Sequence, residues 1–399
     1  MPKHPDIVTS QGMDGAFEIP SFTVPACHQG STVSLYLHIP FCRHLCPYCA
    51  FYKQENPPAE TIDRLVDALI SELHWYAPQQ LSLRSIFWGG GTPTLLNKDQ
   101  WQRLYTAITT VFHVPDNTEQ TVEVNPETVT PDMLAALHQV KVNRLSLGIQ
   151  SFFEKPLQFL GRQHGPETLR RALGYLVESP IKNINLDIMY GLPEKAGQQI
   201  SAELDMALAL PITHLSTYAL SIEPGTPFAK KKVVSPEDRT WQEYLTIRER
   251  LAAHGFRHYE ISAFAKPGHT CAHNLAYWRL SPYIGIGPSA ASYWRGMSYK
   301  NVSDLARYVE SPRPPIAKKA PEFSAQHMAS DYMIANFRRL DVIDTDQISQ
   351  DLGIDAAVVY LDAFQSLLSQ GWIAKVSPSQ YQITDEGIRM HNYLLEVFV

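Results

Sequence analysis

The feature that most constrains the fold is a pattern repeated between residues 33 and 224. Apolar or β-branched runs are followed by short loops of special residues and, in most repeats, by an amphipathic stretch. Strands are predicted at 33–39, 84–88, 120–124, 143–149, 183–189 and 214–220. Apolar residues at helical spacing predict helices at 61–76, 98–111 and 131–140. Strands that alternate with helices in this way form parallel sheets.

Six strand–loop–helix units are too few for a closed eight-fold barrel. We therefore expect an α/β fold built on a partial, open (β/α)6 TIM-type barrel. In TIM-type barrels the loops after the carboxyl ends of the strands carry the chemistry. Beyond this barrel the sequence predicts a helix at 236–254 and a strand at 259–264.

A second, smaller domain is expected at the carboxyl end. Residues 312–321 are rich in proline and lysine and indicate a linker. Three helices and a hairpin follow, which is typical of a small winged-helix-like α+β domain. They are predicted at 324–340, 345–352, 356–371, 372–376 and 381–384. The predicted parts are a tail at 1–30, the core barrel with an extension at 31–311, and the C-terminal domain at 312–399.

Bulk composition narrows the class of protein. The 399 residues exceed one compact core, and the formal net charge of −6 gives no electrostatic reason to expect nucleic-acid binding. No apolar run approaches the roughly 18 residues that span a bilayer. Residues 1–29 lack the apolar core of a signal peptide. We expect a cytoplasmic globular protein.

Three of the five cysteines form one loop, Cys42, Cys46 and Cys49, with the spacing C-x3-C-x2-C. An odd cysteine count without a signal peptide argues against a disulfide framework. Zinc is an alternative, because Cys27, His38 or His44 could complete a tetrahedral set. Structural zinc sites usually pair their cysteines in two groups, whereas three thiolates can hold a [4Fe–4S] cluster and leave one iron open. The spacing resembles that of the radical SAM superfamily, in which S-adenosylmethionine (SAM) binds the open iron.

Two further strand ends carry residues suited to a ligand. The run 89–93, Gly-Gly-Gly-Thr-Pro, permits close backbone approach but fits neither the dinucleotide motif nor a P-loop. A tight turn would explain it equally well, while next to the cysteine loop it suits the amino group of SAM. Glu123 and Asp187 could accept hydrogen bonds from ribose or balance a sulfonium, although each alone could be an ordinary cap.

The motifs together resemble the oxygen-independent coproporphyrinogen oxidase family, from about residue 33 to the C-terminus. They are the cysteine loop with 36–41, Trp88 to Pro93, Glu123 to Pro126, Gly148 to Phe152 and Asp187 to Pro193. The oxidase branch has a fourth cysteine two residues after the third, where this chain has Phe51. The haem chaperone branch has an H-N-x-x-Y-W motif, which His273 to Trp278 matches in full, and an ending similar to residues 394–398. The resemblance favours the chaperone branch.

The resemblance also implies roles for individual residues. The cluster would be held by Cys42, Cys46 and Cys49. SAM contacts would come from Tyr36, Gly90, Gly91, Thr92 and Glu123. The wider family makes further SAM contacts, some to a second SAM in the oxidase, at Tyr48, Gln150, Arg162, Asp187 and Ser221. His273 is the leading candidate for a haem ligand, with Cys271 as the second and a buried structural histidine as the alternative. Two departures are Ala50, where the chaperones have an acidic residue, and Ala291, where they have histidine.

The function implied is a haem chaperone that binds haem, a [4Fe–4S] cluster and SAM, and delivers haem to acceptor haemoproteins. The expected partners are an electron donor such as flavodoxin or ferredoxin and, through peripheral contact, membrane-bound haemoproteins. One alternative is a radical SAM enzyme that decarboxylates coproporphyrinogen or degrades haem anaerobically. Another is a zinc-stabilised scaffold without catalysis.

Overall fold

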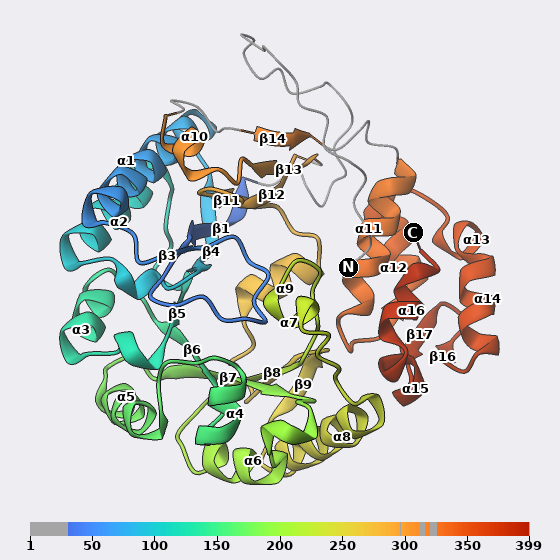
Figure 1. Ribbon diagram of the computed structural model, residues 1–399. Coiled ribbons are helices and arrows are strands. Elements are labelled where there is room, and N and C mark those ends of the chain that lie inside the picture. The colour runs from blue at the N-terminus through green and yellow to red at the C-terminus, as the bar shows by residue number, and fades with distance from the viewer. Residues whose placement is uncertain (1–30, 296, 311–315, 320–324, 399) are drawn as a thin grey trace.

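The computed structural model describes residues 31–295, 297–310, 316–319 and 325–398 (Figure 1). The tail predicted for residues 1–30 lies outside the described residues. All six predicted strands are present and form a parallel sheet in chain order. They are β1 (Thr32–Ile39), β4 (Ser82–Gly90), β5 (Glu119–Val124), β6 (Arg144–Gln150), β7 (Asn183–Tyr190) and β8 (His214–Ala219).

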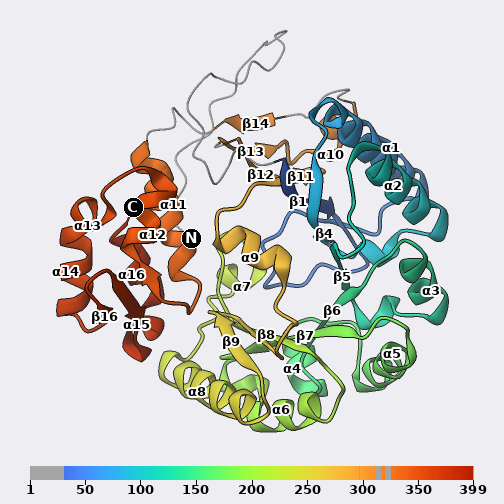
Figure 2. The same cartoon turned by 180° about the vertical axis from the view of Figure 1, so that it is seen from behind.

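Helices surround these strands on the outside, as Figures 1 and 2 show from opposite ends. They are α1 (Ala59–Trp75), α2 (Lys98–Val111), α3 (Pro131–Gln139), α4 (Glu154–Phe159), α5 (Pro166–Glu178), α6 (Ile200–Leu208) and α8 (Glu237–Ala253). Short 3-10 turns lie at Ala77–Gln79, Pro93–Leu95, Pro126–Thr128 and Glu194–Ala196. The main core lies between strands and helices, where Trp88 of β4 packs on Trp101 of α2 with ring centroids 4.7 Å apart.

The inner face of the barrel is polar. Successive residues of a strand point to opposite faces, so Leu35 and Leu37 face the helices while Ser34, Tyr36 and His38 face inward. The same alternation along β4 to β8 turns mostly polar side chains inward. These are Ser85, Phe87, Glu119, Thr121, Glu123, Arg144, Ser146, Asn185, Asp187, His214, Ser216 and Tyr218. Hydrogen bonds between neighbouring strands, such as Ser85 to Ser34 at 2.9 Å, confirm the shared face.

The sheet extends beyond the six predicted strands at both ends. β11 (Tyr283–Ile286) pairs in parallel with the free side of β1, and β12 (Ala291–Trp294), β13 (Met297–Asn301) and β14 (Ile316–Lys319) follow antiparallel. At the other end β10 (Ala263–Ala265) and β9 (Arg257–Glu260) pair antiparallel beyond β8. The twelve strands begin at β14 and end at β9, so the barrel is open, as predicted.

Two local predictions were wrong. The single strand expected at 259–264 is the pair β9 and β10, separated by Ile261 and Ser262, because the Ser262 carbonyl accepts from the Thr217 N–H at 2.7 Å instead of continuing the strand. The linker expected at 312–321 contains β14, which pairs with β13; the residues on either side of β14 lie outside the description.

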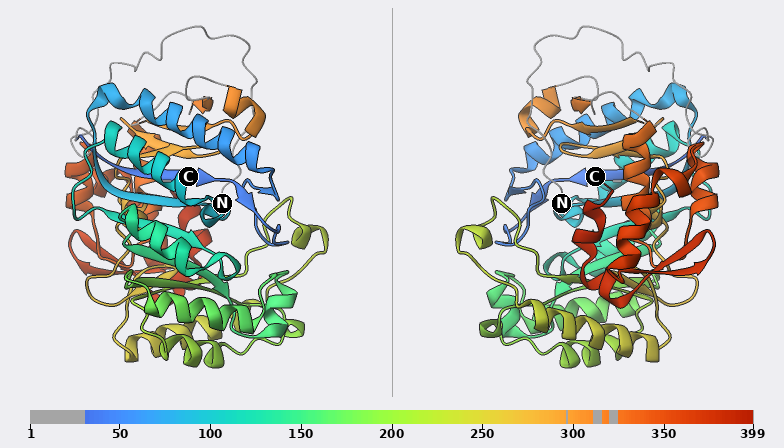
Figure 3. Two further views of the ribbon diagram at one scale, coloured as in Figure 1. Left: turned by 90° about the vertical axis from the view of Figure 1, so that its left-hand side faces the viewer. Right: turned by 90° about the vertical axis from the view of Figure 1, so that its right-hand side faces the viewer.

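Three shorter helices complete the barrel part: α7 (Pro227–Lys230), α9 (Ala272–Trp278) and α10 (Leu305–Glu310). α9 lies within the ring of strands in Figures 1 and 2. It contacts residues at the amino ends of the strands, including Ser85 of β4 and Glu119 of β5. α7 projects at the carboxyl ends, on the same side as the cysteine loop (Figure 3).

Residues 325–398 form a separate layer with their own hydrophobic core, which includes Met333, Phe337, Leu367 and Leu394. The elements are α11 (Ala325–Phe337), β15 (Ile343–Asp344), α12 (Thr345–Leu352), α13 (Ala356–Val359), α14 (Leu361–Ser369), β16 (Ile373–Ser377), β17 (Gln380–Ile383), α15 (Asp385–Arg389) and α16 (His391–Glu396). The helix expected at 356–371 is divided in two at Tyr360. The predicted hairpin is present, and β15 completes a three-stranded sheet. Within the described residues no helix has the length and apolar character to cross a membrane.

Candidate functional site

The cysteine loop is a closed unit at the carboxyl end of β1. Two short strands, β2 (Phe41–Cys42) and β3 (Gln54–Glu55), pair in parallel and bring its ends together. The Asn56 N–H donates to the Cys42 carbonyl at 2.9 Å, and the Cys49 N–H to the Cys46 carbonyl at 3.2 Å. All three thiols are half-buried and free of disulfides. The loop therefore presents three thiols toward the mouth of the barrel.

Arg162 fixes this loop to the ends of two strands. Its guanidinium donates to the Asn125 side-chain oxygen at 2.7 Å and to the Gly148 carbonyl at 2.8 Å, and Nη1 lies 3.5 Å from Cys46 Sγ. These contacts tie Cys46 to the rim formed by β5 and β6. Burial raises the pKa of Cys42 to about 11, despite a hydrogen bond from Thr92.

The three cysteines suit a cubane cluster, and two of the candidates for a fourth zinc ligand are engaged elsewhere, while Cys27 lies outside the described residues. Among the described residues no group of three or more His, Cys, Asp and Glu side chains is arranged to hold one metal ion. Zinc needs its four ligands around one centre, whereas a cubane cluster takes each thiolate at a different iron. His38 and His44, considered above as zinc ligands, bond instead to the Tyr52 carbonyl at 3.0 Å and pair with Glu55 at 3.2 Å.

The glycine run packs directly against the start of the cysteine loop. The Gly91 N–H donates to the Ile39 carbonyl at 2.8 Å and the Thr92 N–H to the Phe41 carbonyl at 2.7 Å. Gly90 has φ +107°, and a Cβ there would lie 2.6 Å from the His38 ring. The backbone therefore comes close to the protein's own loop, and its approach to a ligand stays a prediction.

Two carboxyl groups face the same space inside the mouth. Glu123 accepts the Gly90 N–H at 3.0 Å, and Asp187 accepts from Asn185 at 2.7 Å and from Ser146 at 3.2 Å. Burial, and then the neighbouring Asp187, raise the pKa of Glu123 to about 8. Burial also raises the pKa of Asp187. A cation bound here would favour the ionised form of both groups.

Tyr36 and His38 form a fixed pair beside these carboxyl groups. His38 Nε2 donates to the Tyr52 carbonyl, so Nδ1 is the acceptor and the Tyr36 hydroxyl donates to it at 2.8 Å. Burial lowers the pKa of His38 to about 4, which keeps the ring neutral. The sequence analysis considered His38 only as a zinc ligand; its inward position on β1 is the signal that could have placed it here.

Three other candidates occupy different positions. Gln150 lies at the register shift between β6 and β7 with φ +63°. Tyr48 packs on Phe228 of α7, with ring centroids 6.3 Å apart. Ser221 is exposed and donates to Glu223 at 2.7 Å, with no hydrogen bond to the other candidates in the described part of the chain. Phe51, which stands where the oxidase branch has its fourth cysteine, is 69% exposed.

The two haem-ligand candidates, Cys271 and His273, are fully buried on and before α9. Ser85 gives its proton to Ser34, so His273 Nδ1 donates to Ser85 at 2.9 Å and Nε2 accepts from the Tyr277 hydroxyl at 2.9 Å. Burial lowers the pKa of His273 to about 3. Both ring nitrogens are engaged, so iron coordination requires α9 to rearrange.

Glu119 holds α9 in place and was missed by the sequence analysis. Its carboxylate accepts the N–H groups of Ala272 at 3.0 Å and His273 at 3.1 Å, and the Cys271 thiol lies 3.5 Å away. Burial raises the pKa of Cys271 to about 12, so the thiol stays protonated. The alternation of Glu119, Thr121 and Glu123 along β5 is the signal that these residues face inward. Ala291, in contrast, is exposed at the start of β12.

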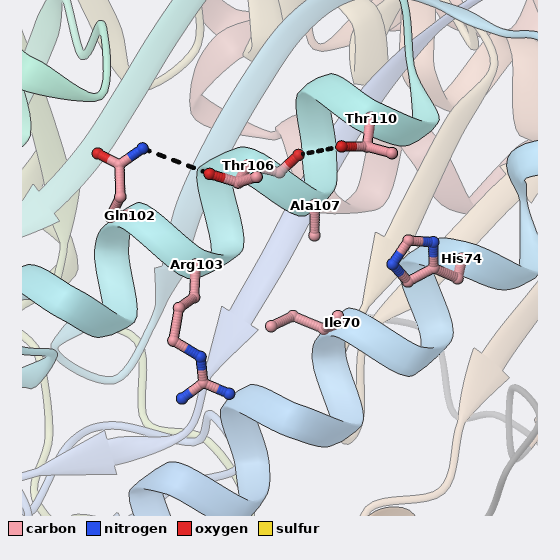
Figure 4. A pocket seen from close by; sticks show the side chains of 7 residues that line it. All are labelled: Ile70, His74, Gln102, Arg103, Thr106, Ala107 and Thr110. Atoms are coloured by element: carbon pink, nitrogen blue, oxygen red, sulfur yellow. Dashed lines mark hydrogen bonds between the residues drawn. The ribbon is translucent and has the colours of Figure 1, made fainter.

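A surface groove lies elsewhere, between α1 and α2 on the outside of the barrel (Figure 4). Its lining includes His74, Arg103 and Thr106 and none of the predicted site residues. This groove is therefore not the candidate site. The candidate residues lie at the mouth of the barrel and in its interior next to α9.

The fold and the cysteine loop define the class of protein. Residues 36–207 match the family described as the Radical SAM superfamily. The fold is similar to that of coproporphyrinogen III oxidase (HemN) from Escherichia coli, with a TM-score of 0.80 and 23% identity over 94% of this chain and 91% of that one. The chain is thus a radical SAM barrel protein.

Sequence relatives define the family more narrowly. The chain is 33% identical to the heme chaperone HemW of Escherichia coli K12 over 382 residues, which cover 92% of this chain and 98% of that protein. It is 30% identical to HemW of Bacillus subtilis strain 168, with 92% and 99% covered. The chain belongs to the HemW family of haem chaperones, which confirms the branch indicated by Phe51 and the His273 motif.

Proposed function

We propose that this protein binds haem together with a [4Fe–4S] cluster and SAM, and passes the haem intact to acceptor haemoproteins. The observation that carries the proposal is a complete H-N-x-x-Y-W motif on α9, inside the same barrel whose mouth presents three free cysteines. Membership of the HemW family supports it.

The cluster would be held by Cys42, Cys46 and Cys49. When bound, the cluster would supply an electron to SAM or would anchor SAM in place. Arg162 contacts Cys46, Asn125 and Gly148 and so ties the loop to the carboxyl ends of the neighbouring strands.

SAM would lie between the glycine run and the inward carboxyl groups. Gly90, Gly91 and Thr92 fix the strand end, and Tyr36, Glu123 and Asp187 line the adjacent interior. The buried carboxyl pair suits the positive sulfonium. Tyr48, Gln150 and Arg162 border this space, while Ser221 would take part only by moving inward.

His273 would be the haem ligand and Cys271 the second candidate. Haem binding would then replace the Tyr277 hydroxyl at Nε2, since both nitrogens are engaged without haem. The core barrel with its extension would occupy 31–311 and the C-terminal domain 312–399. We place the protein in the cytoplasm, with flavodoxin or ferredoxin as electron donor and haemoproteins, including membrane-bound ones, as acceptors.

A haemin titration of the anaerobically purified protein tests the proposal. We expect a Soret band that saturates at one haem per chain and an altered band in His273→Ala. The matched control is His74→Ala, which removes an exposed histidine of α1. A Soret spectrum of His273→Ala identical to wild type would remove His273 from the proposal, and no Soret change in wild type would overturn haem binding.

A second candidate function is oxidative decarboxylation of a porphyrinogen, which the fold similarity to HemN favours. It is tested by incubating cluster-loaded protein with SAM, a reductant and coproporphyrinogen. Normal SAM cleavage without protoporphyrinogen would exclude this activity. Incubation with haem in its place tests anaerobic haem degradation, which altered tetrapyrrole products would reveal.

A further inference from the structure

Arg144 lies on the inner face of the barrel and lacks a direct partner. Its side chain is 2% exposed, and its guanidinium makes no hydrogen bond to another residue of the described chain. The Nε atom is completely buried without an acceptor. A buried charge of this kind costs several kcal/mol unless it is paired. Such a group therefore indicates a partner that is not part of the protein.

Thr121, which lies beside Arg144 on the neighbouring strand, also carries a buried polar group without a partner among the described residues. Thr121 of β5 is the Cα partner of Arg144 on β6, so the two side chains lie on the same face of the sheet. The Thr121 hydroxyl is fully buried and has no hydrogen-bond partner among the described residues. Two adjacent donors without acceptors thus point into the barrel. Together they suit a group with several acceptor oxygens.

The nearest carboxylates are already engaged. Glu119 accepts the N–H groups at the start of α9, and Asp187 accepts from Asn185 and Ser146. Neither forms an ion pair within 4.0 Å of Arg144 among the described residues. Both influence Arg144 only through longer-range attraction. The buried donors of Arg144 and Thr121 therefore lack an acceptor among the described residues and would suit an added anion.

This anion site adjoins the haem-associated helix. Arg144 is close enough to both candidates that its charge adds to the lowering of the His273 pKa by burial and partly opposes the rise of the Cys271 pKa by burial. A haem presents its iron at the centre and two propionate carboxylates at one edge. An imidazole for the iron and a guanidinium for a carboxylate thus lie in one buried cluster.

We propose that Arg144 and Thr121 form a carboxylate-binding site that receives one propionate of the haem. This inference rests on the proposed function, because it takes haem as the cargo. Arg144 supplies the charge and a planar pair of donors, and Thr121 supplies a hydroxyl. The site orients the tetrapyrrole relative to His273.

The test compares haem with its dimethyl ester, whose propionates carry no charge, on wild type, Arg144→Met and Thr121→Val. Affinities are measured by Soret titration of the full chain. Loss of a charge-assisted hydrogen bond is expected to weaken haem binding about tenfold or more in Arg144→Met. The ester should bind wild type and Arg144→Met equally, since it lacks the charge. The control, Arg103→Met, removes an arginine outside the barrel (Figure 4) and should leave haem affinity unchanged.

Thermal unfolding without haem distinguishes a loss of haem affinity from a folding defect in the variants. Arg144→Met should unfold at the same or a higher temperature, since it removes an unpaired buried charge. Equal haem affinity of wild type and Arg144→Met would overturn the inference and leave haem binding intact. Stabilisation of wild type alone by acetate, with haem and ester bound equally, would assign the site to a free small anion instead. If wild type binds neither haem nor ester, the proposed function itself fails.

Discussion

The structure of the barrel mouth depends on a few residues at which even one added atom would cause a clash. Gly90 combines a left-handed φ of +107° with an N–H bond to Glu123 and a position against the His38 ring. Its conformation therefore couples the glycine run, the carboxyl pair and the cysteine loop. No other residue type fits all three demands.

Gly90→Ala should lower the free energy of unfolding by about 2 kcal/mol or more, because its Cβ would lie 2.6 Å from the His38 ring and φ would be strained. Urea unfolding measures this change. Gly174→Ala on α5 is the control, since nothing lies within 4 Å of its Cβ; there we expect a small gain of roughly 0.5 kcal/mol. Equal stability of the two variants would refute this account of the glycine run.

The proposed contact between Glu123 and SAM predicts that SAM affinity depends on pH. The Glu123 pKa of about 8 in the free protein means that the carboxyl is mostly protonated at neutral pH and becomes a carboxylate above pH 8. A positive sulfonium prefers the carboxylate, so affinity should rise from pH 6.5 to 8.5, by up to about tenfold per pH unit below the pKa. Calorimetric titration of cluster-loaded protein measures it.

The control for this dependence is Glu123→Gln, which cannot ionise. Any pH dependence of SAM affinity that remains in Glu123→Gln arises from SAM itself or from the cluster. The difference from wild type arises from Glu123. Identical slopes in both proteins would show that Glu123 does not contact the ligand.

At the scale of elements, β5 joins the two ends of the site. One end of this strand carries Glu123 at the mouth, and the other carries Glu119, which accepts two N–H groups at the start of α9. α9 is only seven residues long, so its position depends on such tertiary contacts more than on its own helical stability. The motif on α9 is thus held by the same strand that carries Glu123 at the barrel mouth.

Glu119→Ala should lower the free energy of unfolding by about 1–3 kcal/mol, because two buried N–H groups lose their acceptor. Hydrogen exchange of the Ala272 and His273 amides should accelerate as well. Glu167→Ala, which breaks a fully exposed pair with Arg170 on α5, is the control and should leave the stability nearly unchanged. Unchanged amide exchange in Glu119→Ala would show that α9 is held by other contacts.

For the whole molecule, the strand–loop–helix repeat predicted the six parallel strands and the open barrel. This succeeded because each run combines apolar residues with a loop of special residues at its carboxyl end. Apart from the strand predicted at 259–264, the additional strands were not predicted, because the pairing of short strands depends on partners distant in the chain. The segment 312–321 was predicted to be a linker because of its proline content, although part of this segment pairs with β13.

The candidate site was predicted in outline for the same reason. Gly90 and Glu123, at the ends of β4 and β5, are hydrogen-bonded to each other, and Arg162 reaches the ends of β5 and β6 from the loop after α4. Ser221 makes no hydrogen bond to the other candidates among the described residues, because a loop position after a strand does not determine where a side chain points. Glu119, Arg144 and Thr121 were missed, because they lie within strands, where only the alternation of faces reveals an inward side chain.

The central claim is that this barrel carries haem and releases it unchanged. The most direct test incubates cluster-loaded protein with haem and SAM under anaerobic, reducing conditions, adds an apo-haemoprotein acceptor, and follows both haem transfer and tetrapyrrole mass. We predict that the acceptor gains haem and that the recovered tetrapyrrole has the mass of intact haem. A tetrapyrrole of altered mass, with no haem in the acceptor, would contradict the claim.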